Sequence, residues 1–346
     1  MSRIVIFGAG AIGCWIGGRL AVGGADVTLV GRPRVLGELE RGLQVSELGG
    51  GQWTVHPKLA TEAVDGELIL VCTKSAQTAD AARALASTTG TIVSMQNGVR
   101  NVPLLREMLP GRSVLAGMVP FNVVRRGPGS YHRGSGGTLA VEHADGAAPL
   151  TEACVRADLA LDLRDDMLAV QWAKLVMNLN NAINALSGQP LATELAQRGY
   201  REILADAQRE ALELLRAAHV KIARVTLVPP RWMPRLLALP DPLFRRLAGR
   251  VVAIDPYARS SMWDDLEAKR PTEIDYINGE VVALAERLGT HAPVNSGLVR
   301  LIREAEAGGK RDFSSDELRH ALQALHSITA NPPPIATTSS ASRNRP

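Results

Sequence analysis

The chain has 346 residues, of which 46% are hydrophobic, 21% charged and 4% aromatic, and its formal net charge is +4. This length suits two domains of a globular protein, whereas so few aromatic side chains and so small a charge excess argue against a nucleic-acid partner. Three well-separated cysteines argue against a disulfide framework and favour a reducing, cytoplasmic location, and the seven histidines show no metal-ligand spacing, so we expect no metal.

The apolar stretch at residues 4–18 is interrupted by four glycines and leads into a strand-like segment, so we do not expect a signal peptide. No run of about 18 apolar residues predicts a transmembrane helix. The sequence therefore predicts a soluble protein with no membrane partner.

Strands and helices alternate along the first 110 residues. Short apolar, β-branched runs predict buried strands at 4–7, 27–30, 43–46, 53–56, 68–72 and 91–94. Helical patterns fit the stretch after residue 13 and residues 75–86 and 99–109. This alternation is typical of a doubly wound, Rossmann-type α/β sheet.

Glycine clusters separate three short β-like runs, at 121–124, 131–132 and 138–141, and this pattern predicts hairpins that close the sheet. From residue 150 onward the pattern is almost entirely helical. We expect a dinucleotide-binding domain at 1–165 and a mainly α-helical substrate domain at 166–330.

Several helix boundaries in the second half are marked by local signals. Asp166 is a candidate helix start, and residues 193–218 carry apolar side chains at the spacing of one long helix. Thr272-Glu273 opens a helix that runs to Gly289, and Asn295 is a candidate cap for the next one. Residues 331–346 are rich in Pro, Ser and Thr and are expected to be a disordered tail.

A glycine-rich motif follows the first predicted strand: Gly8-Ala9-Gly10-Ala11-Ile12-Gly13. Its first glycine permits a tight turn, its second lets a pyrophosphate approach the backbone, and its third lets the helix pack on the strand. The helix start then offers N–H groups to the phosphates. Because the motif lies between a strand and a helix, we interpret it as a dinucleotide site; the alternative is a glycine-rich turn without a ligand.

The end of the second predicted strand indicates which dinucleotide binds. An NAD enzyme usually has Asp or Glu there, to bind the ribose 2′-hydroxyl, but this chain reads Val30-Gly31-Arg32-Pro33-Arg34. Arginine pairs with a 2′-phosphate through its charge and its forked donors. The sequence therefore favours NADP(H), unless these arginines only decorate the surface.

Three further segments gather polar residues where a ligand could bind. Residues 94–98, Ser-Met-Gln-Asn-Gly, follow a predicted parallel strand at its carboxyl end, the edge where α/β sheets bind ligands. Lys174 and Asn178 lie four apart on a predicted helix, and Asn181 falls on the same side. The third segment runs from Ser260 to Met262 and continues at 272–279. The alternatives are that Lys174 is solvated, that Asn178 lies on the surface, and that Thr272-Glu273 only starts a helix.

Together these segments resemble the ketopantoate reductase family (2-dehydropantoate 2-reductase). The glycine motif, Gln96-Asn97-Gly98, the Trp-x-Lys-Leu-x-x-Asn pattern at 172–178 and Thr-Glu-Ile-Asp-Tyr-Ile-Asn-Gly at 272–279 occur in the family's order. The resemblance covers Arg3 to about Gly308. It implies a Rossmann domain followed by a mainly helical domain, with the active site in the cleft between them.

The resemblance also implies roles for individual residues. Lys174 looks like the family's catalytic lysine and Glu273 like its substrate-orienting glutamate. Asn97 matches the asparagine between nicotinamide and substrate. The remaining matches are Asn178 and Ser261 at substrate-binding positions, with Asn181 added as a neighbour, and Arg32 and Lys74 at the adenosine 2′-phosphate.

The chain departs from the family pattern at two positions. Members of the pantothenate pathway usually have asparagines where this chain has Ala182 and Ala258. Asn180, Asn181 or Asn184 could substitute for the first. Residues 220–258 also form a longer segment than in the shorter members of the family.

The resemblance implies NADPH-dependent reduction of 2-dehydropantoate to pantoate, in pantothenate and coenzyme A biosynthesis. Other interpretations stay open: a paralogous reductase of another small anionic 2-oxo acid, a β-hydroxyacid dehydrogenase, or a dinucleotide-sensing binding protein without catalysis. A sensor would need no proton donor such as Lys174. The helical domain could support a homodimer.

Overall fold

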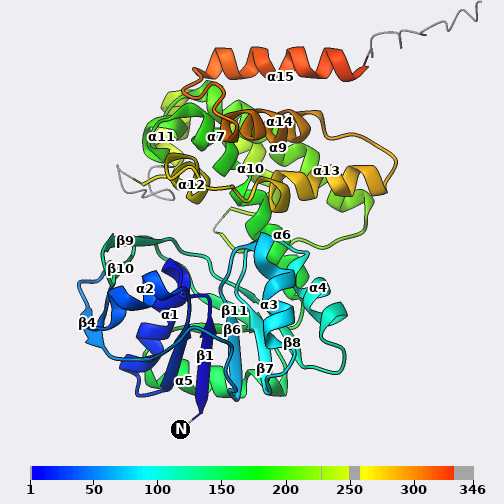
Figure 1. The fold of residues 1–346 in the computed structure, drawn as a ribbon. Coiled ribbons are helices and arrows are strands. Elements are labelled where there is room, and N and C mark those ends of the chain that lie inside the picture. Colours follow the sequence, from blue (N-terminus) through cyan, green and yellow to red (C-terminus); the bar gives the residue numbers. More distant parts are fainter. Residues whose placement is uncertain (1, 227, 249–257, 331–346) are drawn as a thin grey trace, which may run out of the picture.

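The computed structural model describes residues 2–226, 228–248 and 258–330, which form a sheet-containing half and a helical half (Figure 1). The predicted disordered tail at 331–346 lies outside the described residues, and so does part of the long 220–258 segment. An eight-stranded sheet has the order β12-β11-β8-β7-β6-β1-β2-β5. Its strands are β1 Arg3–Phe7, β2 Asp26–Val30, β5 Lys58–Ala60, β6 Leu68–Val71, β7 Thr91–Ser94, β8 Val114–Met118, β11 Leu139–Glu142 and β12 Leu161–Arg164.

The sheet is doubly wound, as its residue pattern predicts. Neighbouring strands from β5 to β8 all pair in parallel, whereas β11 pairs antiparallel with β8 and parallel with the edge strand β12. In β1 the side chains of Ile4 and Ile6 enter one apolar core, whereas Val5 enters the core on the opposite face. Both faces must therefore be covered, and helices cover them: α1 Ala11–Val22, α3 Thr78–Leu85, α4 Asn101–Met108 and α5 Ala148–Arg156.

The predicted hairpins close the sheet only in part. β9 Val123–Gly127 and β10 Ser130–Arg133 form an antiparallel hairpin, but it pairs with β3 Leu43–Ser46 in a separate sheet of order β4-β3-β10-β9. The strand β4 Gln52–Val55 forms the other edge. The expectation that all these runs close the main sheet was wrong, because strand partners are chosen by tertiary contacts that local alternation does not encode. The pattern also missed β5, β8 and β12.

The second half is helical, as predicted. Its helices are α6 Met167–Asn178, α7 Asn180–Ser187, α8 Leu191–Leu195, α9 Arg198–Ala217, α10 Met233–Leu237, α11 Asp241–Ala248, α12 Ser261–Glu267, α13 Asn278–Arg287, α14 Pro293–Glu306 and α15 Ser315–Ala330. The long helix expected at 193–218 is divided into α8 and α9. A short helix α2, Pro33–Leu39, belongs to the first half.

Two predicted helix caps had different outcomes. Asp166 caps α6, because its carboxylate accepts a hydrogen bond of 3.0 Å from the backbone N–H of Ala169. Asn295 does not cap α14: it is the third residue of that helix, fully buried, and its amide donates to Glu210. Pro293 starts the helix two residues earlier, since proline suits the first helical turn.

Helix α6 connects the two halves (Figure 1). Its first turns place Met167 and Val170 in a core of the sheet domain, and its later turns place Leu175 and Val176 in the helical core. A side chain in the middle of α6 therefore lies at the junction of the two halves. Lys174 is such a residue.

Two features are absent from residues 2–226, 228–248 and 258–330. None of the helices there is both long enough and apolar enough to cross a membrane. In the same ranges, no three side chains of His, Cys, Asp or Glu are grouped to hold a metal ion.

Candidate active site

The glycine motif joins β1 to α1, and two of its glycines are required by packing. Gly8 has φ of +115°, and a Cβ there would lie 2.8 Å from the backbone nitrogen of Thr73. A Cβ at Gly13 would collide with the carbonyl oxygen of Gly8. Both positions therefore exclude any larger side chain.

Gly10 is different, because a Cβ there would have no atom of this chain within 4 Å. Its backbone is extended, and no side chain caps the start of α1. The first N–H groups of the helix, beginning at Ala11 and Ile12, are thus left for a ligand. Ala9 donates its N–H to Val30 at 3.0 Å, which holds the loop against the end of β2. These residues fit the pyrophosphate of a dinucleotide.

Four loops meet at one edge of the sheet. Strands β8, β7, β6, β1 and β2 are neighbours and parallel, so the segments that follow their carboxyl ends lie side by side. The glycine motif follows β1, and Arg32 follows β2. Lys74 and Ser75 follow β6, and Asn97 follows β7. This edge is where open α/β sheets bind their ligands.

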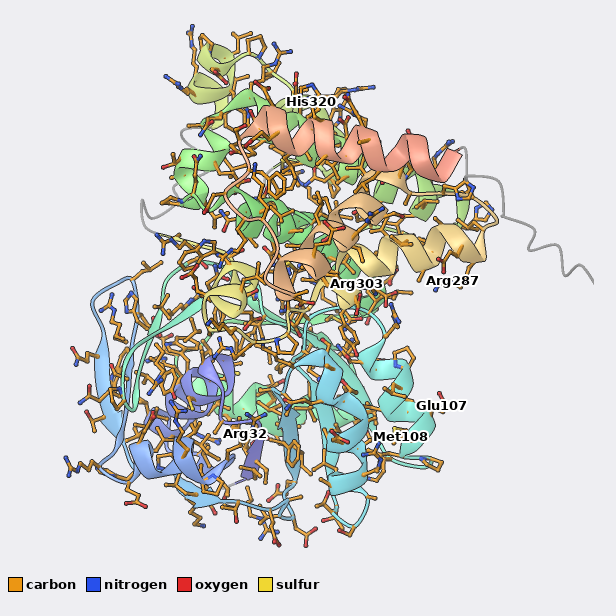
Figure 2. The ribbon with its side chains drawn as sticks, turned by 45° about the horizontal axis from the view of Figure 1, so that its top comes forward. Arg32, Glu107, Met108, Arg287, Arg303 and His320 are labelled. Carbon is orange, nitrogen blue, oxygen red and sulfur yellow. The ribbon has the colours of Figure 1, made fainter. Side chains whose placement is uncertain are left out.

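The two predicted 2′-phosphate residues have different surroundings. Arg32 is exposed at the start of α2 and lies on the sheet-containing half (Figure 2). Lys74 instead forms an ion pair with Asp265 of α12, on the helical half, and its ammonium lies 3.4 Å from the carbonyl oxygen of Pro271. The structure therefore presents Arg32 to solvent, whereas Lys74 is bonded to residues of the helical half.

Lys174, Asn97 and Glu273 form one hydrogen-bonded chain. The ammonium of Lys174 donates to the side-chain oxygen of Asn97 at 2.7 Å and to the carbonyl oxygen of Val119. The amide of Asn97 donates to the Glu273 carboxylate at 3.0 Å. Asn97 is 77 positions from the lysine and 176 from the glutamate, so folding alone brings them together.

The position of Lys174 changes its acidity. Burial lowers the pKa of Lys174 from the ordinary 10.5 to about 8, and the negative charge of Glu273 partly opposes that shift. An ammonium has three hydrogens, and two are used by Asn97 and Val119. The third makes no hydrogen bond to the residues that the structure describes, which leaves it for a ligand.

Sequence reasoning missed Ser75. Its backbone N–H donates to a carboxylate oxygen of Glu273 at 3.0 Å, and its hydroxyl, with one proton to donate, lies 3.0 Å from the same oxygen and 2.8 Å from the carbonyl oxygen of Asn97. Behind it, the amide of Asn101 donates to the carbonyl oxygen of Asn97 and to the Ser75 hydroxyl. Ser75 is buried and directly follows Lys74 at the carboxyl edge of the sheet, so the argument applied to residues 94–98 could have found it.

The predicted substrate-binding residues line the helical side. Asn178 is half-buried one helical turn beyond Lys174. Asn181 is half-buried at the start of α7, and its carbonyl oxygen accepts a hydrogen bond of 3.2 Å from Ser260. That bond places the start of α12, where Ser261 is exposed, beside α7.

Asn184 cannot replace the asparagine side chains that the family pattern has at Ala182 and Ala258. Both ends of the Asn184 amide are occupied, by the N–H of Ser260, the carbonyl of Gln189 and the carboxylate of Glu194. Ala182 is fully buried in the helical core. Of the candidates on this helix, Asn181 is the one whose side chain is partly exposed.

The fold and the site define a nicotinamide dinucleotide-dependent oxidoreductase. Residues 4–146 match the family described as "Ketopantoate reductase PanE/ApbA", and residues 166–306 match its C-terminal part. The chain belongs to the ketopantoate reductase family.

Individual relatives agree with this assignment. The 2-dehydropantoate 2-reductase of Halobacterium salinarum is 28% identical over 89% of this chain and 100% of its own length. The crystal structure of a PanE/ApbA family ketopantoate reductase from Ralstonia eutropha is 28% identical, with a TM-score of 0.76 over 88% of this chain and 99% of that one. D-mandelate dehydrogenase with NADH shares the fold alone, at 19% identity and a TM-score of 0.74 over 88% and 99%.

Proposed function

We propose that this chain uses NADPH to reduce the keto group of 2-dehydropantoate, giving pantoate for pantothenate and coenzyme A biosynthesis. One observation carries the proposal: the ammonium of Lys174 lies in a hydrogen-bonded chain with Asn97 and Glu273. Asn97, the middle member of these three hydrogen-bonded residues, lies at the same sheet edge as the glycine motif.

NADPH would supply the hydride that reduces the carbonyl carbon. Lys174 would hydrogen-bond the carbonyl oxygen, stabilise the negative charge that develops there and donate the proton that makes the hydroxyl. Its pKa of about 8 suits this task, because the donated proton must come from a group charged at neutral pH yet able to release it. Solvent would then restore the proton to Lys174.

Glu273 and Asn97 would orient the reacting groups. The Glu273 carboxylate can accept a hydrogen bond from a substrate hydroxyl, and its charge favours the protonated form of Lys174. Asn97 holds both of those side chains through its two amide ends. Asn178, Asn181 and Ser261 would contact the rest of the substrate from the helical side.

Arg32 supports NADPH over NADH. It is exposed next to the end of β2, and no acidic residue stands at 31–34 to bind a ribose 2′-hydroxyl. An exposed guanidinium at this place can pair with the 2′-phosphate.

A second candidate is the reduction of another small anionic 2-oxo acid. Ala182 is buried and Ala258 has no polar side chain, so the site offers fewer amides than the pantothenate-pathway pattern. The same fold also occurs in D-mandelate dehydrogenase, described in complex with NADH and anilino(oxo)acetate.

The test is a screen of NADPH oxidation by the purified chain with 2-dehydropantoate, pyruvate, 2-oxoisovalerate and benzoylformate, and with Lys174→Met as the matched control. We expect the highest kcat/KM with 2-dehydropantoate, and almost no activity in the control. Activity on other 2-oxo acids but not on 2-dehydropantoate would move the function to the second candidate. Tight NADPH binding with no turnover on any keto acid would instead favour a dinucleotide sensor.

A further inference from the structure

Lys74 lies at the rim of the dinucleotide loop. It follows β6, the neighbour of β1, and the backbone of Thr73 before it packs against Gly8 so closely that a Cβ on Gly8 would lie 2.8 Å from the Thr73 nitrogen. The family resemblance assigns Lys74, together with Arg32, to the 2′-phosphate of the dinucleotide, and this position beside the loop is compatible with that role. The side chain of Lys74 is 41% exposed, so it can move.

In this structure the Lys74 ammonium is bound to a carboxylate of the opposite half. Its partner Asp265 lies on α12, with a side chain that is only 6% exposed. A carboxylate so buried requires a cation, because desolvation without a partner is costly. Lys74, from the sheet-containing half, provides that cation.

Asp265 has a second cation of its own. The guanidinium of Arg270 lies 3.1–3.2 Å from the other Asp265 oxygen, and the Arg270 backbone N–H donates to the Asp265 carbonyl at 2.8 Å. When Lys74 moves away, Asp265 therefore keeps a charged partner. The pair between Lys74 and Asp265 can open without leaving a bare buried charge.

Helix α12 connects this pair to the substrate side. Ser261 and Asp265 are four residues apart and so lie on one face of the helix. The same helix face thus carries a predicted substrate contact and the anion that holds Lys74.

We propose that Asp265 is a specificity-determining residue for the cofactor: it competes with the 2′-phosphate of NADPH for Lys74. While Lys74 is paired with Asp265, discrimination between NADPH and NADH depends mainly on Arg32. This inference rests on the proposed use of a nicotinamide dinucleotide, and it adds a residue that moderates the preference.

The test measures the dissociation constants of NADPH and NADH by fluorescence titration of the full chain without substrate. Asp265→Asn keeps the shape of the side chain and removes its charge, which frees Lys74. We expect NADPH to bind about fivefold more tightly, the size expected for a partly exposed charge pair, with NADH unchanged. Adding Lys74→Ala to Asp265→Asn should remove this gain.

Asp264→Asn is the matched control. Asp264 is exposed on the same helix, and this substitution removes the same charge as Asp265→Asn does. Equal tightening in the Asp264 and Asp265 variants would overturn the proposal, because the effect would then be general electrostatics. Weaker NADPH binding in Asp265→Asn would also overturn it.

Lys74→Ala alone gives an independent result that does not require Asp265→Asn to fold. We expect it to weaken NADPH less than Arg32→Ala does, and a larger loss than that overturns the proposal. If the unmodified chain binds neither dinucleotide, the proposed function itself fails. If it binds NADPH but the Asp265 substitution has no effect, only this inference fails.

Discussion

The two parts of the site, the glycine motif and the Lys174 chain of hydrogen bonds, are built in opposite ways. The motif is six consecutive residues whose packing depends on the missing side chains of Gly8 and Gly13, while Gly10 leaves open space beside the loop. The second part is made of side chains from three distant segments, and it depends on charge and burial. The proposed binding loop is thus local, whereas the environment of the proposed proton donor, Lys174, needs both halves of the molecule.

Removing the amine should have the largest effect. Lys174→Ala removes the proposed proton donor and should lower kcat by about 10²–10⁴-fold, the usual contribution of a general acid. NADPH should still bind, because the glycine motif is untouched. Steady-state kinetics and dinucleotide titration separate the two effects. Unchanged turnover would remove Lys174 from the mechanism.

Reversing the charge of Arg32 tests the proposed binding of the 2′-phosphate. Arg32→Glu places a carboxylate where the 2′-phosphate is expected and should weaken NADPH by about 10- to 100-fold. NADH has no such phosphate and should be affected far less. An equal loss for both dinucleotides would contradict the assignment of Arg32.

The two kinds of glycine can be told apart by one added methyl group. Gly10→Ala should leave the thermal midpoint of unfolding unchanged, because no atom of the chain lies near the new Cβ, but weaken dinucleotide binding by about tenfold. Gly13→Ala collides with the Gly8 carbonyl and should destabilise the fold by about 1–3 kcal/mol. Normal dinucleotide binding by Gly10→Ala would show that no phosphate approaches there.

The pH dependence of kcat/KM tests whether burial lowers the pKa of Lys174 in the working enzyme. Its pKa is lowered to about 8, so the amine is charged and able to donate below that pH and loses its proton above it. We expect kcat/KM to be level between neutral pH and about 8, then to fall about tenfold per pH unit. A decline that starts only near pH 10 would mean that the amine is solvated in the working enzyme.

Ser75→Ala should have the smallest effect. It removes a hydroxyl that contacts Glu273 and the Asn97 carbonyl and accepts from Asn101, but it keeps the backbone N–H bond to Glu273. Because that bond still holds the carboxylate, kcat/KM should fall only about fivefold. Ser75→Thr keeps a hydroxyl and should restore part of the loss. A positioning role predicts a change in kcat/KM with NADPH affinity kept, whereas a loss of stability alone would appear in the thermal midpoint.

Much of the fold follows from local patterns. Alternation of apolar strands and helices correctly indicated the parallel sheet, and Asp166 correctly indicated the start of α6. The prediction that Asn295 caps α14 was wrong. Asparagine often caps helices, but this one is buried inside α14 and donates a hydrogen bond to Glu210. The prediction could not detect this, since burial and long-range partners are not visible in a short window of sequence.

Within the site, resemblance and sequence position proposed Lys174, Asn97 and Glu273, and the structure brings these three together. Ser75 and Asp265 were missed. Each acts on a partner more than 190 positions away, and neither stands in a recognisable motif.

Features that depend on near neighbours could be inferred from the residues alone: the glycine turn, the alternation of elements, and the arginine in place of an acid after β2. The pairing of β10 with β3 and the ion pair of Lys74 with Asp265 became visible only in the folded chain. Strand partners, ion pairs and burial depend on distance in space, and separation along the chain does not specify that distance.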